Sequence, residues 1–235
     1  MSDDLFALPL ERVEELLPRY AVEGPRYTSY PTAPVWKETY GPADFRAELS
    51  REDIDPADPL SIYAHVPFCE SLCHYCACNK VITRNRDLAA RYLDTIEREV
   101  GAVRDAVRIP RRATQHHWGG GTPTYLDPEQ VRRLFAILDG AFPAAPGAEI
   151  SIEVDPRVTS SEHIGALREC GFNRISMGVQ DFDPKVQSAI HRIQSAESTA
   201  ELVSISRESG FESVNFDLIY GLPRRPRASR GPSTR

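Results

Sequence analysis

Short runs of β-branched and apolar residues alternate along the chain with segments whose apolar residues recur at helical spacing. Strands are predicted at 61–66, 114–118, 149–154, 174–179 and 213–220. Between 88 and 107, apolar residues three and four positions apart form one face of a helix. Further helices are predicted at 127–140, 159–171 and, with a break, 183–210, because each of these segments begins at a capping residue and ends at a glycine.

Five strands that alternate with helices predict an α/β fold whose parallel sheet is closed or partly closed into a (β/α) barrel. In such a fold the functional loops follow the carboxyl ends of the strands. The sequences CESLCHYCAC, GGGTPT, DP, QDF and GLP stand at these five positions, in this order. A sixth strand and its helix do not follow, so we expect a partial barrel with an exposed sheet edge and an uncovered apolar interior.

The two ends of the chain differ from this regular middle. Residues 1–58 are rich in Pro, Tyr and acidic residues, and prolines recurring from Pro25 to Pro59 interrupt any long helix or strand there. We interpret residues 1–58 as an N-terminal arm, residues 59–223 as the partial barrel and residues 224–235, RRPRASRGPSTR, as an unstructured arginine-rich tail.

The charge and hydropathy of the chain narrow the classes of partner. A net charge of −6 and a pI near 5.6 argue against broad nucleic-acid binding, which needs a basic face. No apolar run is long enough to span a bilayer, and the N-terminus lacks the basic region of a signal peptide. The expected location is therefore the cytoplasm.

Four of the five cysteines lie close together, at positions 69, 73, 76 and 78. In a reducing compartment this clustering indicates metal chemistry rather than disulfides. Thiolates spaced C-x3-C-x2-C, here Cys69, Cys73 and Cys76, can each bind one iron of a [4Fe-4S] cluster and leave the fourth iron open to S-adenosylmethionine. A structural zinc site is the alternative, although zinc commonly uses two separate C-x2-C pairs. Cys170 is interpreted as a small core residue.

The cysteine loop and its flanks resemble a known family. The segment CESLCHYC after YAHVPF resembles the signature loop of the radical S-adenosylmethionine (SAM) superfamily. The segments CHYCACNK, GPRYTSYPTA, HWGGGTPTYL, IEVDPR, GFNRISMGVQDF and DLIYGLP resemble the oxygen-independent coproporphyrinogen III oxidases, from about residue 20 to Pro223. Members of that family continue with further strands and a C-terminal domain, so the resemblance implies a C-terminally truncated chain.

The resemblance implies an activity in haem and porphyrin biosynthesis. Two propionates of coproporphyrinogen III are converted to vinyl groups by oxidative decarboxylation, which gives protoporphyrinogen IX through a 5'-deoxyadenosyl radical. It also implies two bound SAM molecules, an electron donor for the cluster, an unidentified electron acceptor and a monomeric enzyme.

The resemblance further assigns cofactor contacts to individual positions. Contacts to the SAM on the cluster would come from Tyr63, Tyr75, Gly120 and Glu153. Contacts to the second SAM would come from Gly121, Thr122, Gln180, Arg192 and Asp217. Simpler interpretations stay open: a tight turn for the glycines, a buried arginine as partner of Asp217, and a solvated helix position for Arg192.

Two positions are candidates for the substrate side. Arg26 could bind a propionate, since a guanidinium matches carboxylate geometry, or its segment could simply pack on the barrel. Cys78 resembles the family's fourth cysteine and could serve the substrate or electron transfer. No residue is assigned as catalytic, and the six histidines are interpreted mainly as packing or surface residues.

Two rival functions remain. A haem-trafficking chaperone of the same superfamily would share the C-x3-C-x2-C loop, but such proteins usually lack the RYTSYPTA arm and the fourth cysteine, both of which occur here. An inactive fragment of the oxidase is the other alternative.

Overall fold

The computed structural model describes residues 10–20, 35, 37 and 39–223. The chain divides into two units, Met1–Phe45 and Arg46–Arg235, and each is described by itself. Helix α1 (Leu10–Tyr20) lies in the first unit, and helix α2 (Pro42–Leu49) crosses the boundary. These two helices were not predicted; Pro42 begins α2 instead of interrupting it, because the first helical position needs no N–H donor. The boundary at residue 58 stays a prediction.

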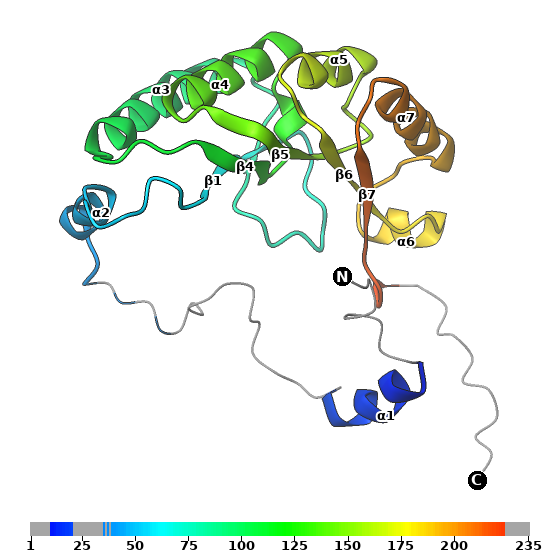
Figure 1. Ribbon diagram of the computed structural model, residues 1–235. Coiled ribbons are helices and arrows are strands. Elements are labelled where there is room, and N and C mark those ends of the chain that lie inside the picture. The colour runs from blue at the N-terminus through cyan, green and yellow to red at the C-terminus, as the bar shows by residue number, and fades with distance from the viewer. Residues whose placement is uncertain (1–9, 21–34, 36, 38, 224–235) are drawn as a thin grey trace. The chain divides into compact units, whose positions relative to one another are not determined.

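The second unit contains an all-parallel sheet (Figure 1). Its order is β1 (Leu60–Val66), β4 (Ala113–Gly120), β5 (Ala144–Val154), β6 (Arg174–Gln180) and β7 (Ser213–Leu218). The predicted α/β class and the five strand positions are confirmed. β5 starts earlier than predicted, since Ala144 pairs with Ala113 and its N–H is held by Asp139 Oδ1 at 2.8 Å.

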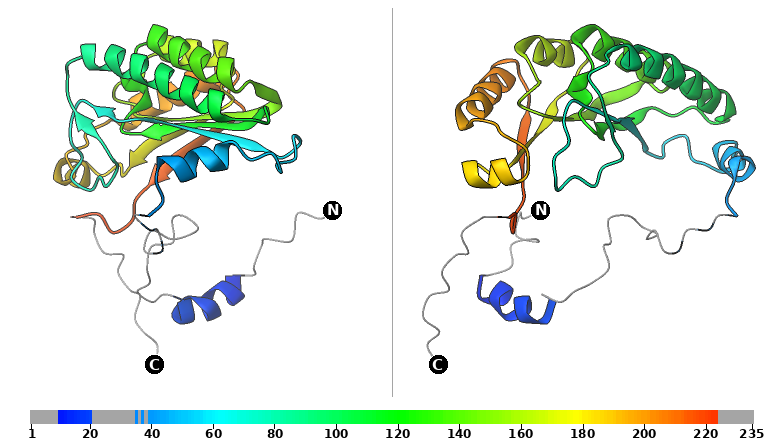
Figure 2. Two further views of the ribbon diagram at one scale, coloured as in Figure 1. Left: turned by 90° about the vertical axis from the view of Figure 1, so that its left-hand side faces the viewer. Right: turned by 180° about the vertical axis from the view of Figure 1, so that it is seen from behind.

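Helices α3 (Asp87–Ala106), α4 (Pro128–Ala141), α5 (Ser161–Glu169) and α7 (Ala196–Glu208) cover one face of this sheet (Figures 1 and 2). The starts of α4 and α5 follow the predicted caps: Asp127 and Gln130 close a capping box on α4, and Ser160 caps α5. The predicted break separates the short helix α6 (Pro184–Ala189) from α7.

Apolar side chains fill the space between the sheet and these helices. Trp118 of β4 is fully buried there and meets the Phe172 ring edge-on, with centroids 4.9 Å apart. Ile152, Ile175 and Leu134 belong to the same core. This helix-covered face therefore holds the main hydrophobic core.

The opposite face of the sheet, which we call the inner face, is polar. It borders a cavity of about 560 Å³ whose lining includes Gln115 and His117 of β4, Glu149 and Ser151 of β5, and Arg174 of β6. The expected apolar interior is therefore wrong for the described residues. The reason is the period-2 alternation along each strand, which sends the apolar residues toward the helices and the polar residues inward.

A second, two-stranded sheet was not predicted. Strands β2 (Phe68–Cys69) and β3 (Val81–Ile82) pair in parallel and bring the two ends of the cysteine segment together. Within the described ranges, no helix has both the length and the apolar character needed to cross a bilayer.

Candidate metal and cofactor site

A cavity of about 250 Å³ lies where the carboxyl ends of the parallel strands meet. It brings together twelve residues singled out from the sequence, namely Cys69, Cys73, Tyr75, Cys76, Cys78, Gly120, Gly121, Thr122, Glu153, Gln180, Arg192 and Asp217. Tyr63 is outside this lining, and Arg26 lies outside the described residues.

The cysteine loop, residues 69–81, is fastened at its ends by backbone hydrogen bonds. Val81 N–H donates to the carbonyl of Pro67 at 2.8 Å, and Thr83 N–H donates to that of Cys69 at 2.9 Å. Lys80 Nζ donates to the carbonyls of Cys76 and Cys78, both at 3.1 Å. The loop thus leaves and re-enters the fold at one place.

Two histidines, which we call the histidine clasp, join the middle of the loop to the end of α6 and the residues that follow it. His74 Nδ1 lies 3.1 Å from the carbonyl of Ala189, and His191 Nδ1 lies 2.9 Å from that of Leu72. The two rings stack, with centroids 5.4 Å apart and planes at 16°. Since a carbonyl can only accept, each Nδ1 carries the proton.

Cys69 and Cys78 have contrasting surroundings. Cys69 Sγ lies 3.4 Å from the hydroxyl oxygen of Thr122, whereas Cys78 is exposed at the cavity rim. Burial raises the pKa of the Cys69 thiol above its usual range, and burial together with the neighbouring Cys76 raises the pKa of Cys78 to about 11. Because thiolates are the metal ligands, iron uptake by the Cys69 thiol would release its proton.

Cys73 is the buried cysteine of the loop, and it meets two guanidinium groups. Arg157 Nη2 donates to Cys73 Sγ at 3.8 Å, and Arg192 Nη1 donates to it at 3.7 Å. Both arginines also pair with Asp155 Oδ2, at 2.6 and 3.0 Å.

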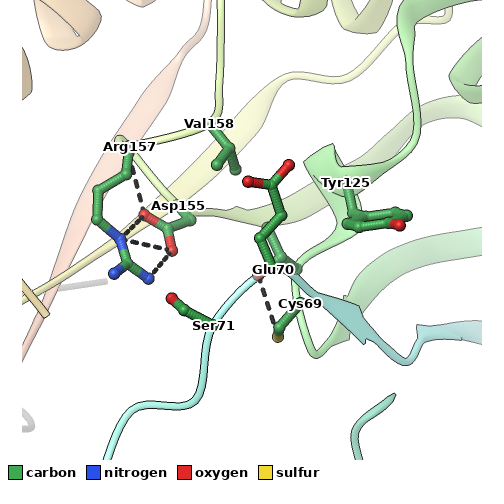
Figure 3. Close-up of a pocket in the computed structure, with 8 residues that line it drawn as sticks. Cys69, Glu70, Ser71, Tyr125, Asp155, Arg157 and Val158 are labelled. Carbon is green, nitrogen blue, oxygen red and sulfur yellow. Dashed lines mark hydrogen bonds and ion pairs between the residues drawn. The ribbon is translucent and has the colours of Figure 1, made fainter. Parts of the chain in front are cut away.

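Figure 3 shows the Arg157 guanidinium lying against the Asp155 carboxylate in a neighbouring pocket of about 200 Å³ that Cys69 also lines. Burial opposes ionisation of Asp155, but the hydrogen bonds and charges of Arg157 and Arg192 outweigh it and hold the pKa of this carboxyl below its usual range. The pair of arginines therefore faces an ionised partner.

The glycines at the end of β4 and directly after it allow a close approach that a side chain would prevent. A Cβ at Gly121 would lie 2.6 Å from the carbonyl oxygen of Pro67, and one at Gly120, whose φ is +118°, would lie 2.9 Å from that of Val66. A Cβ at Gly119 would stand 3.1 Å from the Glu153 carboxylate. The β4 end thus packs against the root of the cysteine loop at backbone distance.

Glu153 and Tyr63 lie on the inner face beside the cavity. His117 stacks on the Tyr63 ring with centroids 5.9 Å apart, and its Nε2 is 3.5 Å from Glu153 Oε1. Tyr63 Oη is 3.0 Å from His65 Nδ1, and His65 Nε2 is 2.7 Å from the carbonyl of Asn79. Because that carbonyl only accepts, Nε2 carries the proton and Tyr63 donates to Nδ1.

The residues expected at the second SAM already have protein partners. Arg192 is buried and also donates to the carbonyl of Gly178 at 2.7 Å, so it is not a solvated helix position. Ser176 Oγ donates to both carboxylate oxygens of Asp217 at 3.2 Å. Gln180 adopts a left-handed φ of 69°, at the end of β6.

The donor set fits an iron–sulfur cluster. Within the described residues, no three side chains of His, Cys, Asp or Glu are grouped so as to hold one metal ion. A cubane does not require such a group, because each thiolate binds a different iron. Three cysteines on one cavity-lining loop, with the backbone of Gly120 and Gly121 lining the same cavity, match that need.

The sequence reasoning missed the charged and docking residues around the loop. Asp155 and Arg157 stood in the quoted segment IEVDPR directly after a strand, so their position was a usable signal. The role of His74 and His191 had no signal, because their contact spans 119 residues to Leu72 and 115 to Ala189.

Comparisons with known proteins agree on one family. Residues 63–230 match the family model described as the radical SAM superfamily. The oxygen-independent coproporphyrinogen III oxidase of Escherichia coli is 47% identical over 209 residues, and that of Pseudomonas aeruginosa is 45% identical over 212 residues. Each alignment covers 89% of this chain.

The chain spans about half the length of these curated relatives, 45% and 46% respectively. A solved structure of the coproporphyrinogen III oxidase from E. coli, a radical SAM enzyme, superposes with a TM-score of 0.80 at 45% identity. The superposition covers 90% of this chain and 46% of the other. The observed sheet therefore corresponds to part of that protein's fold.

Proposed function

The chain belongs to the radical SAM superfamily, and from this premise we propose that it carries the cluster and SAM site of an oxygen-independent coproporphyrinogen III oxidase. The observation that supports this most directly is the cavity that gathers four cysteines with residues from the ends of β4, β5, β6 and β7. The similar curated proteins are named coproporphyrinogen III oxidases and not haem chaperones, which favours a porphyrinogen as the substrate.

In this proposal, Cys69, Cys73 and Cys76 each bind one of three irons of a [4Fe-4S] cluster and leave the fourth iron open to SAM, and the chain's own hydrogen bonds position these cysteines. The pairing of β2 with β3 and the histidine clasp fix the loop before iron arrives. When bound, the cluster and SAM supply the 5'-deoxyadenosyl radical that removes hydrogen from a propionate side chain. Cys78, at the cavity rim, is then free to face the substrate or an electron carrier.

Tyr63, Tyr75, Gly120 and Glu153 are proposed to contact the SAM on the cluster. Tyr75 lines the cavity directly, and Glu153 presents a carboxylate that can accept from an amine or a ribose hydroxyl. Tyr63 is 59% exposed next to Glu153, so its ring can close over a ligand on the inner face.

Gly121, Thr122, Gln180, Arg192 and Asp217 are proposed for the second SAM. Asp217 lines both the cysteine cavity and the larger inner-face cavity, so a ligand there could extend from one into the other. Arg192 would have to share its guanidinium with Asp155.

The proposed substrate is coproporphyrinogen III, with Arg26 as a candidate partner for one propionate. An electron donor to the cluster and an external acceptor complete the reaction. Action as a monomer in the cytoplasm stays a prediction from the sequence.

The test is anaerobic reconstitution with iron and sulfide, followed by dithionite and SAM, with 5'-deoxyadenosine measured with and without coproporphyrinogen III. We expect a cluster spectrum and deoxyadenosine that increases with substrate. Cys73→Ala should lose both signals, whereas the matched control Cys170→Ala should keep them, because Cys170 lies outside the cavity.

A cluster without deoxyadenosine would contradict an active SAM site in this chain and favour an inactive fragment. Stoichiometric haem retention without turnover would instead favour the haem-trafficking alternative. Failure of the wild-type chain to take up iron would contradict the proposal as a whole.

A further inference from the structure

The three proposed cluster ligands differ in the charge around their sulfur atoms. Cys69 Sγ has the neutral Thr122 hydroxyl as its partner, and Cys76 has the Cys78 thiol beside it. Cys73 Sγ receives N–H groups from both Arg157 and Arg192. Within the described part of the chain, side-chain hydrogen bonds from cations reach only this one of the three sulfurs.

We propose that Arg157 and Arg192, held by Asp155, are positioning residues that stabilise the reduced, more negative state of the cluster through Cys73. This inference rests on the proposed function, because it needs a cluster at these cysteines. It goes further by naming the groups that set the ease of its reduction.

The geometry supports a fixed rather than a passing contact. The side chain of Arg192 is 8% exposed and also donates to the Gly178 carbonyl, while Arg157 donates to both carboxylate oxygens of Asp155. A side chain at position 178 would reach 3.0 Å from Arg192 Nη2, so the glycine makes the space that this guanidinium occupies. The two cations cannot leave Cys73 without breaking these bonds.

The charge balance gives the sign of the effect. Two guanidinium groups and one carboxylate leave one net positive charge at Cys73. Hydrogen bonds and positive charge at a cluster sulfur favour the reduced form and raise its reduction potential. Lys80 also lines the cavity, but its ammonium bonds loop carbonyls rather than a sulfur, so its contribution should be smaller.

The experiment compares reconstituted wild type, Arg157→Gln, Arg157→Lys and Arg133→Gln by redox titration followed by electron paramagnetic resonance. Arg157 is chosen because its side chain is 22% exposed and tolerates replacement better than buried Arg192. Arg133→Gln removes the same charge and the ion pairs of this α4 residue with Asp94 and Glu97 of α3, away from the cysteine cavity.

At a fixed potential, we expect the reduced-to-oxidised ratio in Arg157→Gln to fall about tenfold, equivalent to about 59 mV for one electron. Arg157→Lys should recover most of it, and Arg133→Gln should match wild type. If Arg157→Gln binds the cluster but its cluster has the wild-type reduction potential, the inference is overturned while the proposed function stays intact.

Arg192→Gln is the second variant, with the same expected direction. If both glutamine variants fold normally by circular dichroism but hold no cluster, the inference is also overturned, because the pair would then serve assembly rather than reduction. A wild-type chain that binds no cluster removes the proposed function and the inference together.

Discussion

Trp118 and His117 are neighbours on β4, yet they lie on opposite faces of the sheet. Trp118 is fully buried against Phe172 in the helix-covered core, whereas the side chain of His117 is 37% exposed on the inner face, hydrogen-bonded to Ser151. Adjacent residues of one strand therefore serve different purposes: one packs in the stabilising core, and the next presents a polar group on the inner face. The helix-covered face holds the fold together, and the inner face and strand ends are free to carry polar groups.

The largest expected effect is on the helix-covered face. Trp118→Ala should lower the free energy of unfolding by about 3–5 kcal/mol, because it leaves a large cavity in the core. Its matched control, His117→Ala, should cost about 1 kcal/mol, the value of one half-exposed hydrogen bond. Denaturant unfolding followed by circular dichroism measures both, and equal losses would contradict the division between the faces.

The next effect tests the strand ends, where the two faces meet the loop. Gly121→Ala should cost about 1–3 kcal/mol and reduce iron uptake, because its Cβ would overlap the Pro67 backbone. Gly101→Ala, in the middle of α3 with open space around it, should instead stabilise the fold by about 0.5–1 kcal/mol. Denaturant unfolding measures the change in stability of each variant, and iron content after reconstitution measures iron uptake. Normal iron uptake by Gly121→Ala would contradict a role for the close packing of Gly121 against the cysteine loop.

A smaller effect is expected for the histidine clasp. His74→Ala removes the stacked ring and the bond to Ala189, at a cost of about 1 kcal/mol, and should speed amide hydrogen exchange within residues 69–81. His191→Asn should cost less, since Asn tolerates the left-handed φ of 56° and retains a donor. Unchanged exchange in His74→Ala would show that the loop does not depend on the clasp.

The smallest effect is a pH dependence that originates on the helix-covered face. Burial lowers the pKa of both His116 and His163 below its ordinary value of about 6.5. The unfolded chain therefore binds more protons, and stability present above pH 6.5 is lost as the pH falls toward the folded pKa. His116→Leu should reduce the decline in unfolding free energy between pH 7 and pH 5. A decline as steep as that of the wild type would show that the pH dependence comes from other groups.

Much of the fold could be predicted, because the signals are local. The capping residues Asp127 and Ser160 mark where α4 and α5 begin, and the alternation in the strands marks the sheet. The start of β5 was missed because Pro146 and Gly147 look like a turn, although pairing of Ala144 with Ala113 extends the strand. The polarity of the inner face was missed because register, not composition, decides which residues point inward.

The site divides in the same way. The cysteines and glycines were found because they occur in one loop and one turn, and their gathering in one cavity follows from parallel strands ending at one edge. The contact of Arg192 with Asp155 joins residues 37 positions apart, and only the folded chain defines it. The assignments of individual residues to either SAM molecule stay predictions.

The pairing of Phe68–Cys69 with Val81–Ile82 gives the metal-binding segment a narrow neck. Because the pairing of β2 with β3 already holds the two ends of the segment together, the entropy cost of closing the loop is met by this pairing and does not depend on which residues lie between the ends. The segment could therefore be treated as a cassette in protein design. Because residues 68–82 contain both paired strands, transplanting them into another parallel α/β fold would require only a receiving surface that imitates the carbonyls of Ala189 and Ile190.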